Sequence, residues 1–232
     1  MLTLRRPFRT VLLRPIVSVL AAVVTMGSAG CTAVQPPPSS QVDATAAQPL
    51  SYFAAARIMA MPAQLFRTDD PMGWSAQVTD PRAYLAAADS AIERELRARN
   101  YATNWIFPAE LVRSAKRNPT YATDPSAIRA ADAVRRLEHG GSKSLAEPAA
   151  SQLRVLAGLH DARYALVPVE LRFERGSEGS AGGKAVLHLA LVDIRGARLD
   201  WTGEVASDEA ASLAPALLSS LARHFADLIA PR

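Results

Sequence analysis

The middle of the chain alternates between short apolar runs and segments with helical periodicity. Residues 56–64 form an apolar run that ends near Pro62, which predicts a first strand. Asp80 and Pro81 offer an N-cap and a first helical residue with a preset φ, so a helix is predicted over 81–99. Its apolar positions recur every three or four residues, at Leu85, Ala88, Ile92 and Leu96. The charged residues of this helix are interpreted as a solvated face.

The following segment is predicted to be mostly helical. Residues 105–107 are a compact apolar run and are interpreted as a short second strand. A second Asp-Pro pair, at Asp124, is expected to start another helix. Ser144 and Glu147 have the spacing of a capping box, in which two side chains satisfy free N–H groups at a helix start. Helices are therefore predicted over 108–117, from 125 to about 137, and from the capping box to about Asp161.

After residue 161 the pattern changes from helical to alternating. Apolar and charged residues alternate over 165–174, which predicts a half-buried strand. One face is expected to carry Ala165, Val167, Val169, Leu171 and Phe173, and the other Glu170, Arg172 and Glu174. Pro168 has no N–H to donate, so the strand is expected to lie at a sheet edge or to be bulged there.

Two more strands and a helix complete the predicted fold. The Gly- and Ser-rich residues 176–183 predict a hairpin turn into a strand over 184–194, and a third strand is predicted over 199–205. An amphipathic helix is predicted over 209–229, with Pro215 in its first turns or at a kink. The fold class is therefore α/β, with helices packed on a mixed sheet. The C-terminal part of that sheet is a three-stranded antiparallel meander, closed by the C-terminal helix.

The first 30 residues have the pattern of an export signal. The apolar stretch 16–26 has the usual length of a signal-peptide core and is too short to span a bilayer. We therefore predict a cleavable signal over 1–30. The Arg pair followed by Phe8 also resembles a twin-arginine signal, and the Sec and twin-arginine routes both stay open. The only charged residues before Cys31 are Arg5, Arg6, Arg9 and Arg14.

The residues before Cys31 resemble the bacterial lipobox, in which small residues precede a cysteine that receives a diacylglyceryl group. Ala29 and Gly30 match this pattern, and Ser28 stands where a Leu is usual. The resemblance implies that signal peptidase recognises Ser28, Ala29 and Gly30 and that lipid on Cys31 anchors the protein to a membrane. The alternative is an ordinary secretory signal with a chance cysteine.

The chain after Cys31 is predicted to be a tether followed by a neutral domain. Residues 32–49 are rich in Pro, Ser, Ala, Gln and Thr, which cannot form a core. We expect the lipidated cysteine and tether over 31–50 and one α/β domain over 51–232. The chain has 26 Lys and Arg against 22 Asp and Glu, and the whole excess precedes Cys31. This distribution argues against a nucleic-acid partner.

No motif for catalysis, a metal or a cofactor follows Cys31. The four histidines lack metal-ligand spacing, and no second cysteine is present to join them. Ser219 and Ser220 lie on a predicted helix, outside a nucleophile elbow. Residues 176–183 open no helix and so lack the geometry of a phosphate-binding loop. We predict no enzyme activity, no cofactor and no metal. The histidines are His139, His160, His188 and His224.

The segment 113–124 is the candidate partner-binding loop. Basic and aromatic side chains surround Asn118 and Pro119, and Tyr and Arg are favoured at interfaces. The alternative is a solvated helix end stopped by Asn-Pro. The candidate residues are Arg113, Lys116, Arg117, Asn118 and Tyr121.

Residues 51–230 resemble the periplasmic α/β domain shared by the TolB amino-terminal domain, the curli-secretion lipoprotein and the lipoprotein activators of penicillin-binding proteins. The segments that carry the resemblance are the run 162–167, the Leu-Val-Asp-Ile-Arg-Gly run 191–196 and the Leu-Asp-Trp run 199–201. The early segments 57–64, 81–99 and 105–107 fit as well. The group serves several functions, so the resemblance implies a fold and favours action through protein contacts.

The leading hypothesis is a non-enzymatic binding or scaffolding lipoprotein of the cell envelope. Its partner is expected to be another envelope protein or a second copy of the chain. Thr32 after the cysteine favours the outer membrane, facing the periplasm, by the sorting rule of lipoproteins. The alternatives are a subunit of an oligomeric secretion or assembly complex, and an envelope hydrolase that uses acidic residues such as Asp193 and Asp200.

Overall fold

A four-stranded mixed sheet forms the centre of the computed structural model, which describes residues 50–140 and 143–230. The strands lie in the order β1 (Ile58–Ala60), β2 (Tyr164–Arg175), β3 (Gly183–Asp193) and β4 (Arg198–Ala206). β1 is parallel to β2, and β2, β3 and β4 form an antiparallel meander. The predicted α/β class and meander are confirmed.

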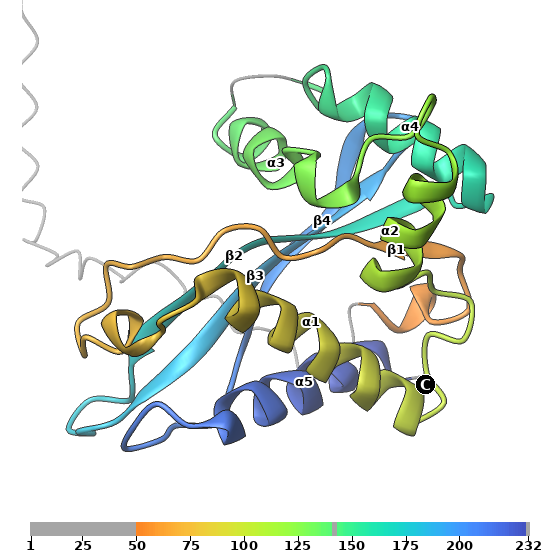
Figure 1. Ribbon diagram of the computed structural model, residues 1–232. Coiled ribbons are helices and arrows are strands. Elements are labelled where there is room, and N and C mark those ends of the chain that lie inside the picture. The colour runs from red at the N-terminus through yellow and green to blue at the C-terminus, as the bar shows by residue number, and fades with distance from the viewer. Residues whose placement is uncertain (1–49, 141–142, 231–232) are drawn as a thin grey trace, which may run out of the picture. The chain divides into compact units, whose positions relative to one another are not determined.

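Helices cover both faces of the sheet (Figure 1). α1 (Pro81–Ala98) and α5 (Pro215–Ile229) lie on one face. α2 (Pro108–Arg117), α3 (Ala130–Glu138) and α4 (Ala149–His160) contribute to a second hydrophobic cluster on the other face. Each face therefore has its own core. No helix of the described residues is long and apolar enough to cross a membrane.

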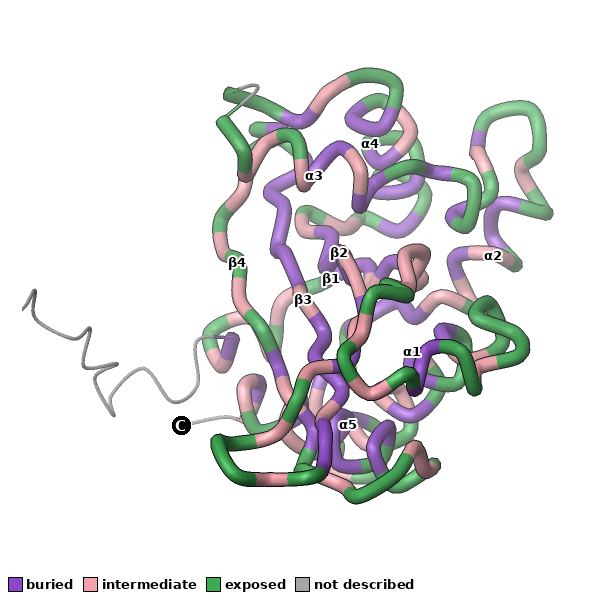
Figure 2. Tube along the Cα trace, turned by 90° about the vertical axis from the view of Figure 1, so that its left-hand side faces the viewer, coloured by how far each residue is buried: buried purple, intermediate pink, exposed green. Residues whose placement is uncertain are grey.

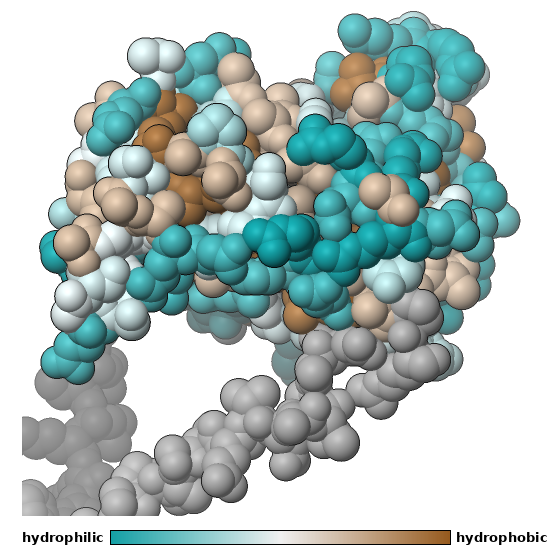
Figure 3. Space-filling view, turned by 90° about the horizontal axis from the view of Figure 1, so that it is seen from below, coloured by the Kyte–Doolittle hydropathy of each residue, from teal (hydrophilic) through white to brown (hydrophobic). Residues whose placement is uncertain are grey.

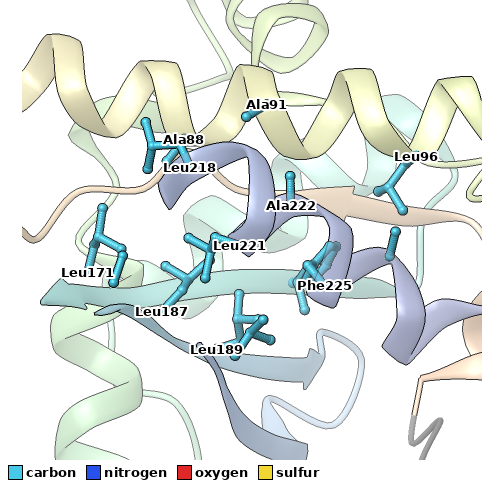
Figure 4. Packing of buried hydrophobic residues seen from close by; sticks show 14 of the residues in the cluster. Ala88, Ala91, Leu96, Leu171, Leu187, Leu189, Leu218, Leu221, Ala222 and Phe225 are labelled. Atoms are coloured by element: carbon cyan, nitrogen blue, oxygen red, sulfur yellow. The ribbon is translucent and has the colours of Figure 1, made fainter. Parts of the chain in front are cut away.

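The C-terminal helix packs beside α1 on the same face of the sheet. Leu221 and Phe225 of α5 are fully buried, and both point toward strand residues such as Leu187 and Leu189 (Figure 4). The small side chains Ala88 and Ala91 of α1 lie along the contact between the two helices. The apolar face of α5 is thus used inside the domain. The surface seen from below carries a broad hydrophilic band, with hydrophobic residues gathered in a smaller area (Figure 3).

Local signals place the starts of α1 and α2 correctly. The Asp80 carboxylate accepts hydrogen bonds from the N–H groups of Arg82 and Ala83, as expected of an N-cap. α2 has the predicted bounds. Residues 209–214 are not helical, and the last helix begins at Pro215. Proline fits the first helical position because it needs no N–H partner there. The expectation that Pro215 lies in the first turns is confirmed, whereas the start at 209 is wrong.

Four local predictions are corrected. β1 spans three residues, not 56–64, and 105–107 contribute only a bridge between Ile106 and Met59. The predicted helix 125–137 is divided into the short 3-10 helix η4 (Pro125–Ala127) and α3. The predicted capping box is also wrong. The N-cap residue of α4 is Pro148 rather than Ser144, and the Glu147 carboxylate accepts a hydrogen bond from the Ser151 N–H.

A bulge in β2 changes which face its side chains cover. The register shifts between Pro168 and Glu170, so Pro168 is accommodated by a bulge although β2 lies inside the sheet. Val167 and Val169 pack on the α3 and α4 side, whereas Leu171 and Phe173 pack on the α1 and α5 side. The prediction of a single apolar face over 165–173 is therefore wrong. Figure 2 shows β3 mostly buried and the edge strand β4 mixed in exposure.

Candidate functional site

The predicted lipidation site lies outside the described residues. Cys31 and the recognition residues Ser28, Ala29 and Gly30 precede residue 50, where the described structure begins. Lipidation therefore stays a prediction from the sequence.

The predicted partner-binding residues form a basic surface at the end of α2. Arg113, Lys116 and Arg117 have the spacing i, i+3 and i+4, which places them on neighbouring positions of the helix. All three are exposed, and none forms an ion pair with another described residue. Tyr121 in the following turn is 76% exposed. We call these four residues the α2 basic surface.

Asn118 has a structural role beside this surface. It is the C-cap of α2, and its side-chain amide donates to the Ser114 carbonyl at 2.9 Å. Its own carbonyl accepts from the N–H groups of Tyr121 and Ala122. The turn that presents Tyr121 is therefore held by hydrogen bonds to Asn118. The interpretation of Asn118 as a helix stop is confirmed.

A groove of about 520 Å³ begins where this loop ends. It lies between α1, the segment that follows β1, and the turn that contains η4. Its floor and walls are partly aliphatic, and its polar groups come from all three segments. The lining residues are Pro62, Ala63, Gln64, Arg82, Leu85, Ala86, Asp89, Asp124, Ser126 and Ala127. We call this the Asp89 groove.

Asp89 is the half-buried carboxylate of this groove. Its two oxygens accept from the same donor, the Ala63 N–H, at 3.1 and 3.3 Å. Burial raises the pKa of Asp89 to about 7, and the hydrogen bond from Ala63 opposes this shift. No described basic side chain lies within ion-pair distance of Asp89, although Arg82 lines the same groove. The site therefore holds a carboxylate with unused acceptor positions.

Gln64 fixes the opposite wall of the groove. Its side-chain amide donates to the carbonyls of Pro125 at 3.0 Å and Ile128 at 2.8 Å. The Asp124 carboxylate accepts from the Ser126 N–H at 2.8 Å and so caps η4. These bonds tie the end of the predicted loop to the segment after β1. The α2 basic surface and the Asp89 groove are thus linked by a short, hydrogen-bonded connection.

Sequence reasoning missed Asp89 and Gln64. A signal for Asp89 was present, because it follows Leu85 by four residues and precedes Ile92 by three, on the apolar side of α1. A charged residue at such a position is partly shielded from water. Gln64 offered no comparable signal, since its partners lie 61 and 64 residues away in the chain.

The acidic residues considered for hydrolysis have other roles. Asp193 is buried, accepts from the N–H groups of Arg195 and Gly196, and pairs with Arg163 at 2.8 Å. These bonds hold the turn between β3 and β4, which confirms the interpretation of Asp193 as a turn former. Asp200 pairs with Arg198 at 3.2 Å. Neither carboxylate lines the Asp89 groove.

His188 and Ser220 each have local hydrogen-bond partners. His188 pairs with Glu138 at 3.0 Å, in agreement with a hydrogen-bonded imidazole in a strand. The Ser220 hydroxyl donates to the Leu217 carbonyl and accepts from the Asp208 N–H. His160 is buried, and burial lowers its pKa, although the charge of Glu110 opposes this shift. Its Nε2 atom has no hydrogen-bond partner among the described residues.

Solved structures provide the matches to this chain, whereas no family model and no curated protein sequence matches it. The PelC dodecamer from Paraburkholderia phytofirmans aligns with 16% identity over 77% of this chain and 93% of that one, at a TM-score of 0.37. The LpoB C-terminal domain from Escherichia coli aligns with 13% identity over 71% and 96%, at a TM-score of 0.34. Lipoprotein GNA1162 from Neisseria meningitidis aligns with 15% identity over 73% and 94%, at a TM-score of 0.36. One of these solved structures is thus named a lipoprotein.

Proposed function

We propose that this protein is a lipid-anchored, non-enzymatic lipoprotein of the bacterial cell envelope whose α/β domain binds another envelope protein. The observation that carries the proposal is the pairing of the α2 basic surface with the adjoining Asp89 groove. Three basic side chains and one half-buried carboxylate lie there without ion-pair partners among residues 50–140 and 143–230. Charged groups left unpaired beside a groove favour the recognition of a complementary protein surface.

The lipid anchor is proposed from the sequence before residue 50. Cys31 follows Ser28, Ala29 and Gly30 in a lipobox-like order, and the tether 32–49 then separates the lipid from the domain. A tether of this length reaches about 23 Å as a coil and up to roughly 56 Å if fully extended. The domain can therefore meet partners at a distance from the membrane. Thr32 supports the outer membrane, facing the periplasm, as the location.

The alternatives receive less support from the described residues. The acidic residues expected for a hydrolase, Asp193 and Asp200, are engaged in a turn and an ion pair. A subunit of an oligomeric secretion or assembly complex remains compatible with the proposed binding role, because the partner of the α2 basic surface is then a neighbouring subunit. The two binding roles differ in the partner that a crosslinking experiment would identify.

A photo-crosslinking experiment tests the proposed function. A benzophenone amino acid at Tyr121 is expected to trap one predominant envelope protein in living cells, identified by mass spectrometry. The matched control carries the same group at Tyr52, which is 88% exposed and lies in the short 3-10 helix Ser51–Phe53, outside the four residues of the α2 basic surface. Charge removal by R113Q, K116Q and R117Q is expected to lower the Tyr121 crosslink at least several-fold.

The crosslinking pattern also separates the alternatives. A product that contains two copies of this chain assigns the surface to self-association. Equal amounts of crosslinked product from Tyr121 and Tyr52 would contradict the binding role of this surface. The absence of any crosslinked product, together with an enzyme activity that a point substitution in the domain abolishes, would contradict it as well.

A further inference from the structure

We propose that the Asp89 groove binds a basic side chain, Arg or Lys, of the partner protein. This inference rests on the proposed function and adds the chemistry that the groove recognises. It also concerns a residue that lies outside the predicted partner-binding loop.

The first argument is the position of the Asp89 carboxylate. The Ala63 N–H holds the carboxylate toward the segment after β1, and this is its one hydrogen-bond donor among the described residues. An ionised carboxylate offers about four acceptor positions to donors. A guanidinium or ammonium group supplies several donors together with the opposite charge. Asp89 therefore lacks the kind of partner that a basic side chain provides.

The second argument is the shape and lining of the groove. Its volume of about 520 Å³ lies within the range of roughly 300–1,000 Å³ that is common for ligand pockets. Aliphatic groups of Pro62, Leu85 and Ala86 can pack along the methylene stem of Arg or Lys. The carboxylate of Asp124 lines the opposite wall. Two carboxylates and an aliphatic wall suit a long cationic side chain better than an anion or a neutral amide.

The third argument is that the domain does not neutralise Asp89 itself. Arg82 lies two helical turns before Asp89 and lines the groove, yet the two residues form no ion pair. The titratable and charged groups that line the groove around Asp89 are thus Arg82 and Asp124. The position opposite the Asp89 carboxylate is left to a group from outside the domain.

Carbon-13 NMR of the full chain, labelled at the aspartate Cγ atoms, tests this inference directly. The probe is the capped peptide acetyl-Gly-Arg-Gly-amide, added at pH 8 to protein in detergent micelles. The Asp89 signal, assigned by its loss in Asp89→Asn, is expected to shift in a saturable manner. Its titration midpoint is expected to move to lower pH by about 1, because a cation within a few ångströms favours the ionised form.

Matched controls make the result specific. The same peptide with citrulline in place of Arg has a similar shape and no charge, and it is expected to leave the Asp89 signal unchanged. Ala86→Trp is expected to block the groove and abolish the shift while the carboxylate stays in place. Glu178→Gln removes an exposed carboxylate at the hairpin tip and is expected to keep full binding. An equal response to the Arg and citrulline peptides, or none to either, overturns the proposal.

Two further arms identify the source of the cation and separate this inference from the proposed function. Agmatine, a free guanidinium compound, is expected to bind at least several-fold more weakly than the Arg peptide. Tighter binding of agmatine would overturn the proposal that the cation is a side chain of the partner protein and would indicate a free small cation.

If Asp89→Asn retains the full Tyr121 crosslink, the binding role of the α2 basic surface stands and the groove assignment fails. If the Arg peptide binds but no crosslink forms, the groove assignment stands and the proposed partner fails.

Discussion

At the scale of single residues, Asp89 is the side chain that the sequence pattern hides. One polar residue does not disturb the periodicity of Leu85, Ala88, Ile92 and Leu96, so the helix is predicted correctly and Asp89 is grouped with its solvated face. The structure instead places this carboxylate in a groove formed with Ala63 and the turn at Asp124. The position follows from contacts distant in the chain, which periodicity does not contain.

Replacement of Asp89 by Asn is expected to stabilise the protein at high pH. The pKa of Asp89 is about 7 in the folded chain and about 3.8 when unfolded, so the folded chain keeps a proton that the unfolded chain loses between these values. Stability therefore falls as the pH rises through this window, and the loss is complete above it. We expect Asp89→Asn to be more stable by roughly 1–2 kcal/mol at pH 8 and equal to the wild type near pH 4.

Urea unfolding of the full chain at both pH values measures this difference. Glu178→Gln serves as the control, because this exposed residue is expected to leave the pH dependence unchanged. A less stable Asp89→Asn variant at pH 8 would show that the carboxylate contributes to the fold. Asp89 would then have a structural role in the groove and not a binding role.

At the scale of elements, the order of helices and strands follows from local signals, but the exact pairing does not. Asp-Pro predicts the start of α1 correctly, while the same pair at Asp124 starts only η4. Both outcomes satisfy the same N–H groups, so the pair alone cannot distinguish them. The bulge at Pro168 was foreseen, but its reversal of the buried face was not, because side-chain alternation is read on a regular strand.

Deletion of Val169 is expected to destabilise the domain but to leave it folded. Pro168 pairs with Leu189 and Glu170 with His188, so Val169 is the extra residue of the bulge. Its removal leaves regular pairing, in which Leu171 and Phe173 keep their buried face. The deletion removes the fully buried Val169 side chain, and this loss costs roughly 1.5–3 kcal/mol. Circular dichroism and limited trypsin digestion measure the outcome. Deletion of Glu178 at the hairpin tip shortens the chain equally and is expected to leave the stability nearly unchanged. An unfolded Val169 deletion would show that the bulge itself is required for folding.

At the scale of the whole molecule, the charge distribution bears on how the protein is held at a membrane. The four excess positive charges all precede Cys31, in the segment predicted to be removed. The α2 basic surface is local and is balanced by acidic residues elsewhere in the neutral exported part. A neutral domain has little net attraction to anionic headgroups, and salt screens what attraction remains. Lipid on Cys31 is thus the expected anchor, supported by the sequence alone.

The anchor prediction separates lipid from charge through salt. Wild-type protein in isolated membranes is expected to resist washing with 1 M salt, at which the Debye length is about 3 Å, because a hydrophobic anchor is not screened. Cys31→Ser is expected to appear in the soluble fraction even at low salt, whereas R113Q, K116Q and R117Q together should leave membrane retention unchanged. Mass spectrometry of the membrane fraction should find Cys31 acylated. Release of the wild type by salt, or retention of Cys31→Ser, would instead assign the anchoring to charge and to the α2 basic surface.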